Sequence, residues 1–204
     1  SGKFEKRAEA FLSENESIVK KTVSKEDIFN YYNDKFRPYG DLGQIFKFIK
    51  GKTFSNDEEK VREVYYFTRH QYYTQYVEAF VVKEANLFYP FDLYENPIFF
   101  NTEEAFINHF MAFLKESKIN YEIIVGTAKF NGSIEDLLIQ KNVTVLLKVN
   151  TEKPLYLEFF TPFSSADQFN FLLENTQAYA LQVSKGRKVV DSELITLPAT
   201  TAKD

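Results

Sequence analysis

The feature of this sequence that most constrains its fold is a change in the spacing of apolar residues near Lys118. Before this residue, apolar side chains recur at helical spacing. After it, they gather in short extended runs rich in Val, Leu, Ile and Tyr. Helices that come first and strands that follow are typical of the α+β class. We therefore predict N-terminal helices packed on a C-terminal antiparallel β-sheet.

Helix start signals divide the first half of the chain. Expected helices cover residues 24–37, 41–51 and 55–68, because each begins with capping residues or acids and continues with apolar residues at helical spacing. The clearest helix starts at residue 101 and turns Phe106, Phe110, Phe113 and Leu114 inward. Between the third and fourth helices, residues 76–82 read as a strand, followed by an aromatic loop with Pro90 and Pro97.

The second half reads as strands separated by turns. The expected strands are residues 121–125, 143–149, 155–160 and 179–183. Ser1-Gly2 resembles the remnant of a cleaved tag, and the tail from residue 191 reads as a linker or terminal strand. We expect an excised middle domain of three parts. These are an N-terminal helical segment (1–54), a core (55–190) and the tail (191–204).

Composition excludes several classes of function. The net charge of −4 and the short, diluted basic stretches argue against a nucleic-acid partner. The chain has no cysteine, which excludes disulfides and thiol chemistry, and no apolar run long enough to span a bilayer. Its two histidines, His70 and His109, have no ligand partner three or four residues away. We therefore predict no metal site and no cofactor.

A group of tyrosines is the first candidate for a binding surface. These tyrosines lie around the third expected helix and its exit, and they are Tyr65, Tyr66, Tyr72, Tyr73 and Tyr76. Exposed tyrosines stack on sugar rings or anchor a protein partner. The alternative is a large aromatic core with the hydroxyl groups at its rim.

Carboxylates are the second candidate. Glu158 lies between Leu157 and Phe159 in an apolar run, where strand alternation puts it on the polar face. Glu103 stands at a helix N-terminus, where the helix dipole favours negative charge without any catalytic role. An enzyme would instead pair Glu158 with Glu103 or Asp92 in a cleft, one of the two acids having a raised pKa.

Several segments resemble motifs of one family. Residues 60–73 are similar to its "K-x-x-x-x-Y-x-x-x-x-x-x-Y" helix, and residues 101–125 to its nucleophile-bearing helix and the strand that follows. Residues 142–145 occupy its "N-H-V-x-V" strand, residues 155–162 its "Y-W-L-D-P-T" strand, and residues 174–181 its "P-x-x-x-Q-G-x-x-A-L" segment. The chain thus resembles a transglutaminase-like superfamily domain, of the type found in multidomain bacterial envelope proteins with flanking β-rich domains.

The resemblance implies a papain-like core and three catalytic positions. The nucleophile falls near Thr102 or Glu103, the histidine at Val143 or Thr144, and the acid near Glu158. A catalytic triad needs a nucleophile, a base that activates it and a group that orients the base. The cysteine and the histidine of the family are absent here, so we expect no catalysis and interpret Thr102 as a helix cap.

The resemblance therefore implies a pseudoenzyme that serves as a binding or structural module of a larger exported bacterial protein. Its location would be periplasmic or in the cell envelope. Its partner would be a protein or a glycan, beside flanking domains of the same chain. Two alternatives stay open: a hydrolase that uses carboxylates, Glu158 with a second acid, and a plain interaction scaffold of unrelated α+β fold.

Overall fold

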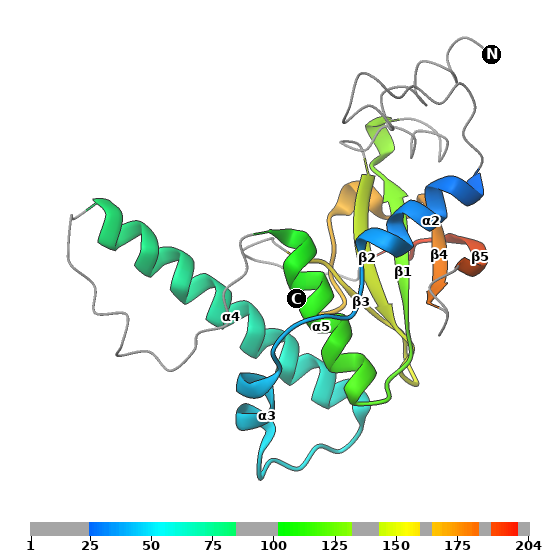
Figure 1. The fold of residues 1–204 in the computed structure, drawn as a ribbon. Coiled ribbons are helices and arrows are strands. Elements are labelled where there is room, and N and C mark those ends of the chain that lie inside the picture. Colours follow the sequence, from blue (N-terminus) through cyan, green and yellow to red (C-terminus); the bar gives the residue numbers. More distant parts are fainter. Residues whose placement is uncertain (1–24, 85–101, 132–142, 160–164, 184–188, 200–204) are drawn as a thin grey trace.

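The computed structural model describes residues 25–84, 102–131, 143–159, 165–183 and 189–199, and Figure 1 draws the fold. Its helices are α2 (Lys25–Lys35), α3 (Gly43–Ile49), α4 (Asp57–Glu84) and α5 (Glu103–Glu116). Its strands are β1 (Tyr121–Thr127), β2 (Val143–Val149), β3 (Leu155–Leu157), β4 (Gln177–Val183) and β5 (Val189–Thr196). They form one antiparallel sheet in the order β3-β2-β1-β4-β5. The predicted α+β class, with helices preceding an antiparallel sheet, is confirmed.

Helix starts follow the capping signals of the sequence. The Asn56 side-chain oxygen accepts a hydrogen bond from the Glu59 amide at 2.8 Å, and the Glu59 carboxylate accepts one from the Ser55 amide. Thr102 does the same for α5, where its hydroxyl oxygen accepts from the Ala105 amide at 3.1 Å. These bonds satisfy backbone amides that have no partner within the helix.

The two faces of the sheet contact different parts of the chain. Side chains such as Ile123, Val125 and Leu147 share one core cluster with buried residues of all four helices. Ile124 and Leu146, on the other face, form a second cluster with residues of the 165–183 segment and Leu197. Figure 1 shows α2 crossing over the sheet and α5 lying along its β3 side. The helices before residue 55 and the later elements therefore share one core.

Three sequence predictions about local structure are wrong. Residues 76–82 belong to α4, not to a strand; their aromatic and β-branched side chains favoured a strand, but the helix started at Asp57 continues through them. The strand predicted at 155–160 ends at Leu157, and the strand predicted at 121–125 continues to Thr127. For the tail, the terminal-strand alternative is confirmed, because residues up to Thr196 pair with β4 as part of β5. The loop with Pro90 lies outside the described residues.

The segment between α2 and α3 is fastened to α5. The Arg37 amide donates to the Asn108 side-chain oxygen at 2.7 Å, and the Tyr39 amide donates to the Asn108 carbonyl at 3.1 Å. His109 lies 2.7 Å from the Asp41 carbonyl through Nε2, which must donate because a carbonyl only accepts. His109 is buried, and that burial lowers its pKa. This histidine therefore has a packing role.

Gly40 permits this fastening, because it has φ of +152° and lies against the His109 ring. A Cβ at this position would stand 2.6 Å from His109 Cδ2. We expect Gly40→Ala to lower the free energy of unfolding by about 2 kcal/mol, measured by urea denaturation. The matched control is Gly43→Ala, at the first residue of α3, where φ is not positive and the nearest atom to a Cβ, at 3.2 Å, belongs to the flexible Asp41 side chain; the expected change is below about 1 kcal/mol. Equal effects of the two substitutions would contradict this explanation.

Candidate functional site

The end of β3 meets the start of α5 through an aromatic cluster. Phe159 is buried, and its ring lies 4.9 Å from Phe106, 5.6 Å from Phe110 and 5.9 Å from Tyr65, between ring centroids. These partners come from α5 and α4. The chain that leaves β3 is therefore held against both helices, and this fixes the main chain at Glu158.

Glu158 is held by both its main chain and its side chain. Its carbonyl oxygen accepts a hydrogen bond from the Tyr65 hydroxyl at 2.6 Å. Its carboxylate oxygen Oε2 accepts one from the Asn170 amide at 2.9 Å. Glu158 thus connects the end of β3 to α4 on one side and, on the other, to the turn that precedes η5 (Phe171–Leu173).

Glu103, the first residue of α5, interacts electrostatically with Glu158. The pKa of the Glu103 carboxyl is raised to about 7, chiefly by burial and secondarily by the negative charge of Glu158. The ammonium group of Lys35, in α2, acts in the opposite direction. A carboxyl group with a pKa of about 7 can give or take a proton near neutral pH, which is the property that a general acid or base needs.

The remaining positions that the family resemblance implies hold no catalytic group. The Thr102 hydroxyl caps α5, as predicted. Val143 is half-buried against the helix-facing core, and Thr144 follows it in β2 opposite Gly126 of β1. Neither a valine nor a threonine side chain acts as a base at neutral pH.

The predicted tyrosine surface needs correction. Tyr65 is fully buried, because its ring fills the space between Phe110 and Phe159 while its hydroxyl reaches the Glu158 carbonyl. Tyr65 therefore contributes no exposed surface. Tyr66 is 37% exposed and its hydroxyl accepts a hydrogen bond from the Ala166 amide at 3.1 Å. Tyr72, Tyr73 and Tyr76 lie in α4, but their side chains are outside the described part, as is the whole of Asp92.

Lys35 and Asn170 are site residues that the sequence did not indicate. Lys35 closes the last turn of α2, and Asn170 caps η5, its side-chain oxygen accepting from the Leu172 amide at 3.0 Å. Both reach the site only because distant elements pack together, and no local pattern marks them. In the sequence, Asn170 is only a residue type that is common in turns.

The described residues contain no group of three or more His, Cys, Asp or Glu side chains that could hold a metal ion. His70 is exposed on α4 and His109 is occupied by the Asp41 carbonyl. Among the helices that the structure describes, none is both long and apolar enough to cross a membrane.

Comparisons with protein-family models, with curated proteins and with solved structures give no significant match. The chemistry of Glu103 and Glu158 must therefore be inferred from their own surroundings. Those surroundings are a partly buried carboxyl group at the start of α5, on which the charges of Glu158 and Lys35 act in opposite directions.

The helix cap that Thr102 provides at the start of α5 can be tested by substitution. Thr102→Ala removes the acceptor for the Ala105 amide, and we expect the free energy of unfolding to fall by about 1 kcal/mol in urea denaturation. Thr102→Ser keeps the hydroxyl and is expected to lose less than half of that amount. If the serine variant were as unstable as the alanine variant, the contribution of Thr102 to stability would not come from helix capping by its hydroxyl.

Proposed function

We propose that this chain is a non-catalytic domain of the transglutaminase-like type, acting as a binding or structural module within a larger exported bacterial protein. The single observation that carries the proposal is the packing of the end of β3 against the first turns of α5, where the Phe159 ring lies 4.9 Å from the Phe106 ring and the charge of Glu158 acts on Glu103. These are the positions where the family resemblance puts the nucleophile and the acid. Both hold carboxyl groups, and a carboxyl pair with a neighbouring Val-Thr is not a cysteine-histidine-acid triad.

The pairing of β2 with β3 supports the position of the family's histidine, at Val143 or Thr144. β2 and β3 are antiparallel, with Leu147 opposite Leu157, so the first residues of β2 lie at the same end of the sheet as Glu158. α5 packs on this sheet through Phe106 and Phe110 and begins at that end. A helix start, a strand start and a strand end near one another support the proposal, since the resemblance puts its three catalytic positions on these elements.

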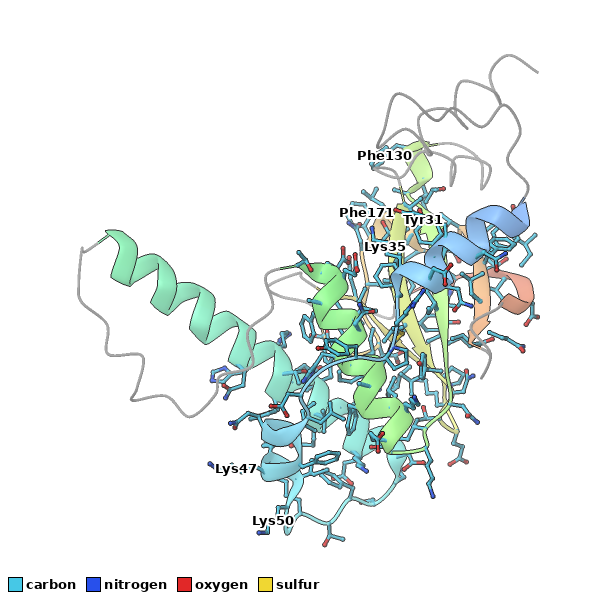
Figure 2. The ribbon with its side chains drawn as sticks, viewed as in Figure 1. Tyr31, Lys35, Lys47, Lys50, Phe130 and Phe171 are labelled. Carbon is cyan, nitrogen blue, oxygen red and sulfur yellow. The ribbon has the colours of Figure 1, made fainter. Side chains whose placement is uncertain are left out.

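Exposed aromatic residues at this end support a role in binding. Phe130, in η2 (Lys129–Asn131), and Phe171, in η5, are 72% and 68% exposed. The two turns contact each other, and the Lys129 ammonium group donates to the Phe171 carbonyl at 3.3 Å. Figure 2 shows both rings at the same end of the sheet as Lys35. Exposed aromatic rings are typical anchors for protein partners and sugar rings.

A binding screen tests this function. We expect the chain to bind members of a glycan or peptide array, and the double variant Phe130→Ser/Phe171→Ser to bind the best of them roughly tenfold more weakly. The matched control is Tyr39→Ser, which removes an 80% exposed ring beside α5 and should leave binding unchanged. Absence of binding at millimolar ligand, or equal losses in control and double variant, would contradict the proposal.

A carboxylate hydrolase is the second candidate, favoured by the raised pKa of Glu103 beside Glu158. Such a pair is how glycoside hydrolases divide acid and base roles. A panel of chromogenic glycosides separates the candidates. Turnover that Glu103→Gln reduces by about 100-fold or more would replace the module with an enzyme.

A further inference from the structure

The chain passes from one face of the sheet to the other beside β3, the last strand on that side. Residues 165–170, which we call the edge strap, make this passage. Ala166 is buried in the core cluster that includes the helices, whereas Phe169 is buried in the cluster on the other face. Between them, the Asp167 amide donates a hydrogen bond to the Tyr156 carbonyl of β3 at 2.8 Å. The edge strap therefore lies along an edge of the sheet, and an uncovered edge strand is open to pairing with another chain.

The Arg62 guanidinium group, in α4, fastens the edge strap. Its Nη1 donates to the Ala166 carbonyl at 3.3 Å, and its Nη2 lies 3.8 Å from the Asp167 carboxylate. Glu58, one turn earlier in α4, accepts from the same guanidinium group at 2.9 and 3.0 Å. Lys153 supplies a second cation, 3.6 Å from the Asp167 carboxylate. The Arg62, Glu58 and Asp167 side chains are only 25%, 28% and 27% exposed, so water and salt screen their attraction less than that of fully exposed pairs.

Asp167 has a backbone conformation that needs external support. Its φ of +69° lies in the left-handed region, which residues with a Cβ rarely adopt. This conformation costs free energy of its own, so contacts with surrounding groups must hold it. Arg62 and Lys153 hold the side chain, and Tyr156 holds the amide. Weakening these contacts favours another backbone conformation in the edge strap, while β1 keeps its pairing with β2 and β4.

We propose that the edge strap opens as a unit apart from the rest of the fold, and that Arg62 is the positioning residue that keeps it closed. Opening withdraws Phe169 from the second core cluster and frees the start of η5, which carries the exposed Phe171. Leu173, buried in the same cluster, anchors the far end of the moving segment. Because the closing contacts are ionic, salt shifts the balance toward the open strap. The inference goes beyond the proposed function, because closure of the strap does not depend on what the domain binds.

Native-state hydrogen exchange of the ¹⁵N-labelled chain, followed by NMR, tests the edge strap. The reporters are the amides of Ala166 and Asp167, which donate to the Tyr66 hydroxyl and the Tyr156 carbonyl. We expect these two amides to share one protection factor, at least about tenfold below that of the slowest β1 amides, because the strap opens while the sheet stays intact. Raising NaCl from about 0.05 M to about 1 M should lower their protection about threefold relative to β1.

Charge-removing variants supply the sharper part of the test. Arg62→Met should lower the protection of both strap amides roughly tenfold, and Asp167→Asn roughly threefold, with β1 amides changed less. Asparagine tolerates the left-handed conformation as aspartate does, so Asp167→Asn removes the charge and keeps the backbone. The matched control is Arg37→Met, since Arg37 pairs with Asp34 at 2.9 Å only three residues away. This control should leave the strap amides unchanged.

Four results would each contradict the edge strap. Its two amides could exchange only together with those of β1, or show no protection at all. Their protection relative to β1 could be the same in low and high salt. Arg37→Met could change it as much as Arg62→Met does. If Arg62→Met fails to fold, Asp167→Asn and Lys153→Met make the same comparison, and unchanged protection in both would refute the ionic closure.

Discussion

Replacing Phe159 by alanine is expected to lower the free energy of unfolding by about 3–5 kcal/mol. The ring is 2% exposed and touches Tyr65, Phe106 and Phe110, which belong to two helices. Its removal leaves a cavity where α4, α5 and the end of β3 meet, and three edge-to-face or tilted ring pairs are lost with it. Chemical denaturation monitored by circular dichroism measures the effect.

The matched control is Phe171→Ala, since this ring is 68% exposed and its removal should change stability by less than about 0.5 kcal/mol. Phe159→Leu keeps most of the volume and should lose less than half of the alanine effect. A loss below about 1 kcal/mol for Phe159→Ala would show that the end of β3 is not anchored as described, and Glu158 would lose its fixed position.

Glu103→Gln is expected to stabilise the chain at alkaline pH by on the order of 2–3 kcal/mol, while leaving it nearly unchanged near pH 4. The pKa of Glu103 is raised in the folded state from 4.5 to about 7. Because the folded state binds this proton more tightly than the unfolded state does, its contribution to stability is fully present below pH 4.5. It is lost as the pH rises through about 7. The glutamine cannot ionise, so the variant does not lose this stability as the pH rises.

Urea denaturation of both proteins across about pH 4 to 8.5 measures this difference. Glu104→Gln, one residue along the same helix, is the control for replacing a carboxyl group by an amide at this helix start. A constant difference between wild type and Glu103→Gln at all pH values would contradict the raised pKa of Glu103.

Local signals in the sequence predicted much of the fold. Asn56 and Thr102 mark helix starts because their side chains reach amides within one turn, and apolar residues at β1, β2 and β4 mark strands. The α4 helix was cut short in the prediction, because its Tyr- and Val-rich second half has strand propensity. The free energy gained by extending an established helix is larger than the gain from that strand propensity.

The site was predictable only in part. Sequence pattern and family resemblance singled out Glu103 and Glu158, but the effect of one on the pKa of the other depends on how α5 packs beside β3. Lys35 and Asn170 lie 68 residues before Glu103 and 12 residues after Glu158, and no short-range pattern links such positions. For Tyr65 the sequence leaves open an exposed surface or an aromatic core, and the structure shows the core, with the hydroxyl donating to the Glu158 carbonyl.

The most direct test of the proposed transglutaminase-like arrangement is to install the missing groups. The chain has no cysteine, so Glu103→Cys introduces a single thiol at the start of α5. Val143 packs against the same core cluster as α5, whereas alternation turns its neighbour Thr144 to the other face of β2. A histidine at 143, but not at 144, should therefore stand beside that thiol.

The measurement is the rate of thiol alkylation by iodoacetamide near about pH 6.5, where an unperturbed cysteine is mostly protonated. We predict that Glu103→Cys/Val143→His reacts at least about tenfold faster than Glu103→Cys alone, because the histidine stabilises the thiolate. Glu103→Cys/Thr144→His, the matched control, should react like the single variant. Equal rates in all three folded variants would contradict the transglutaminase-like arrangement of this site.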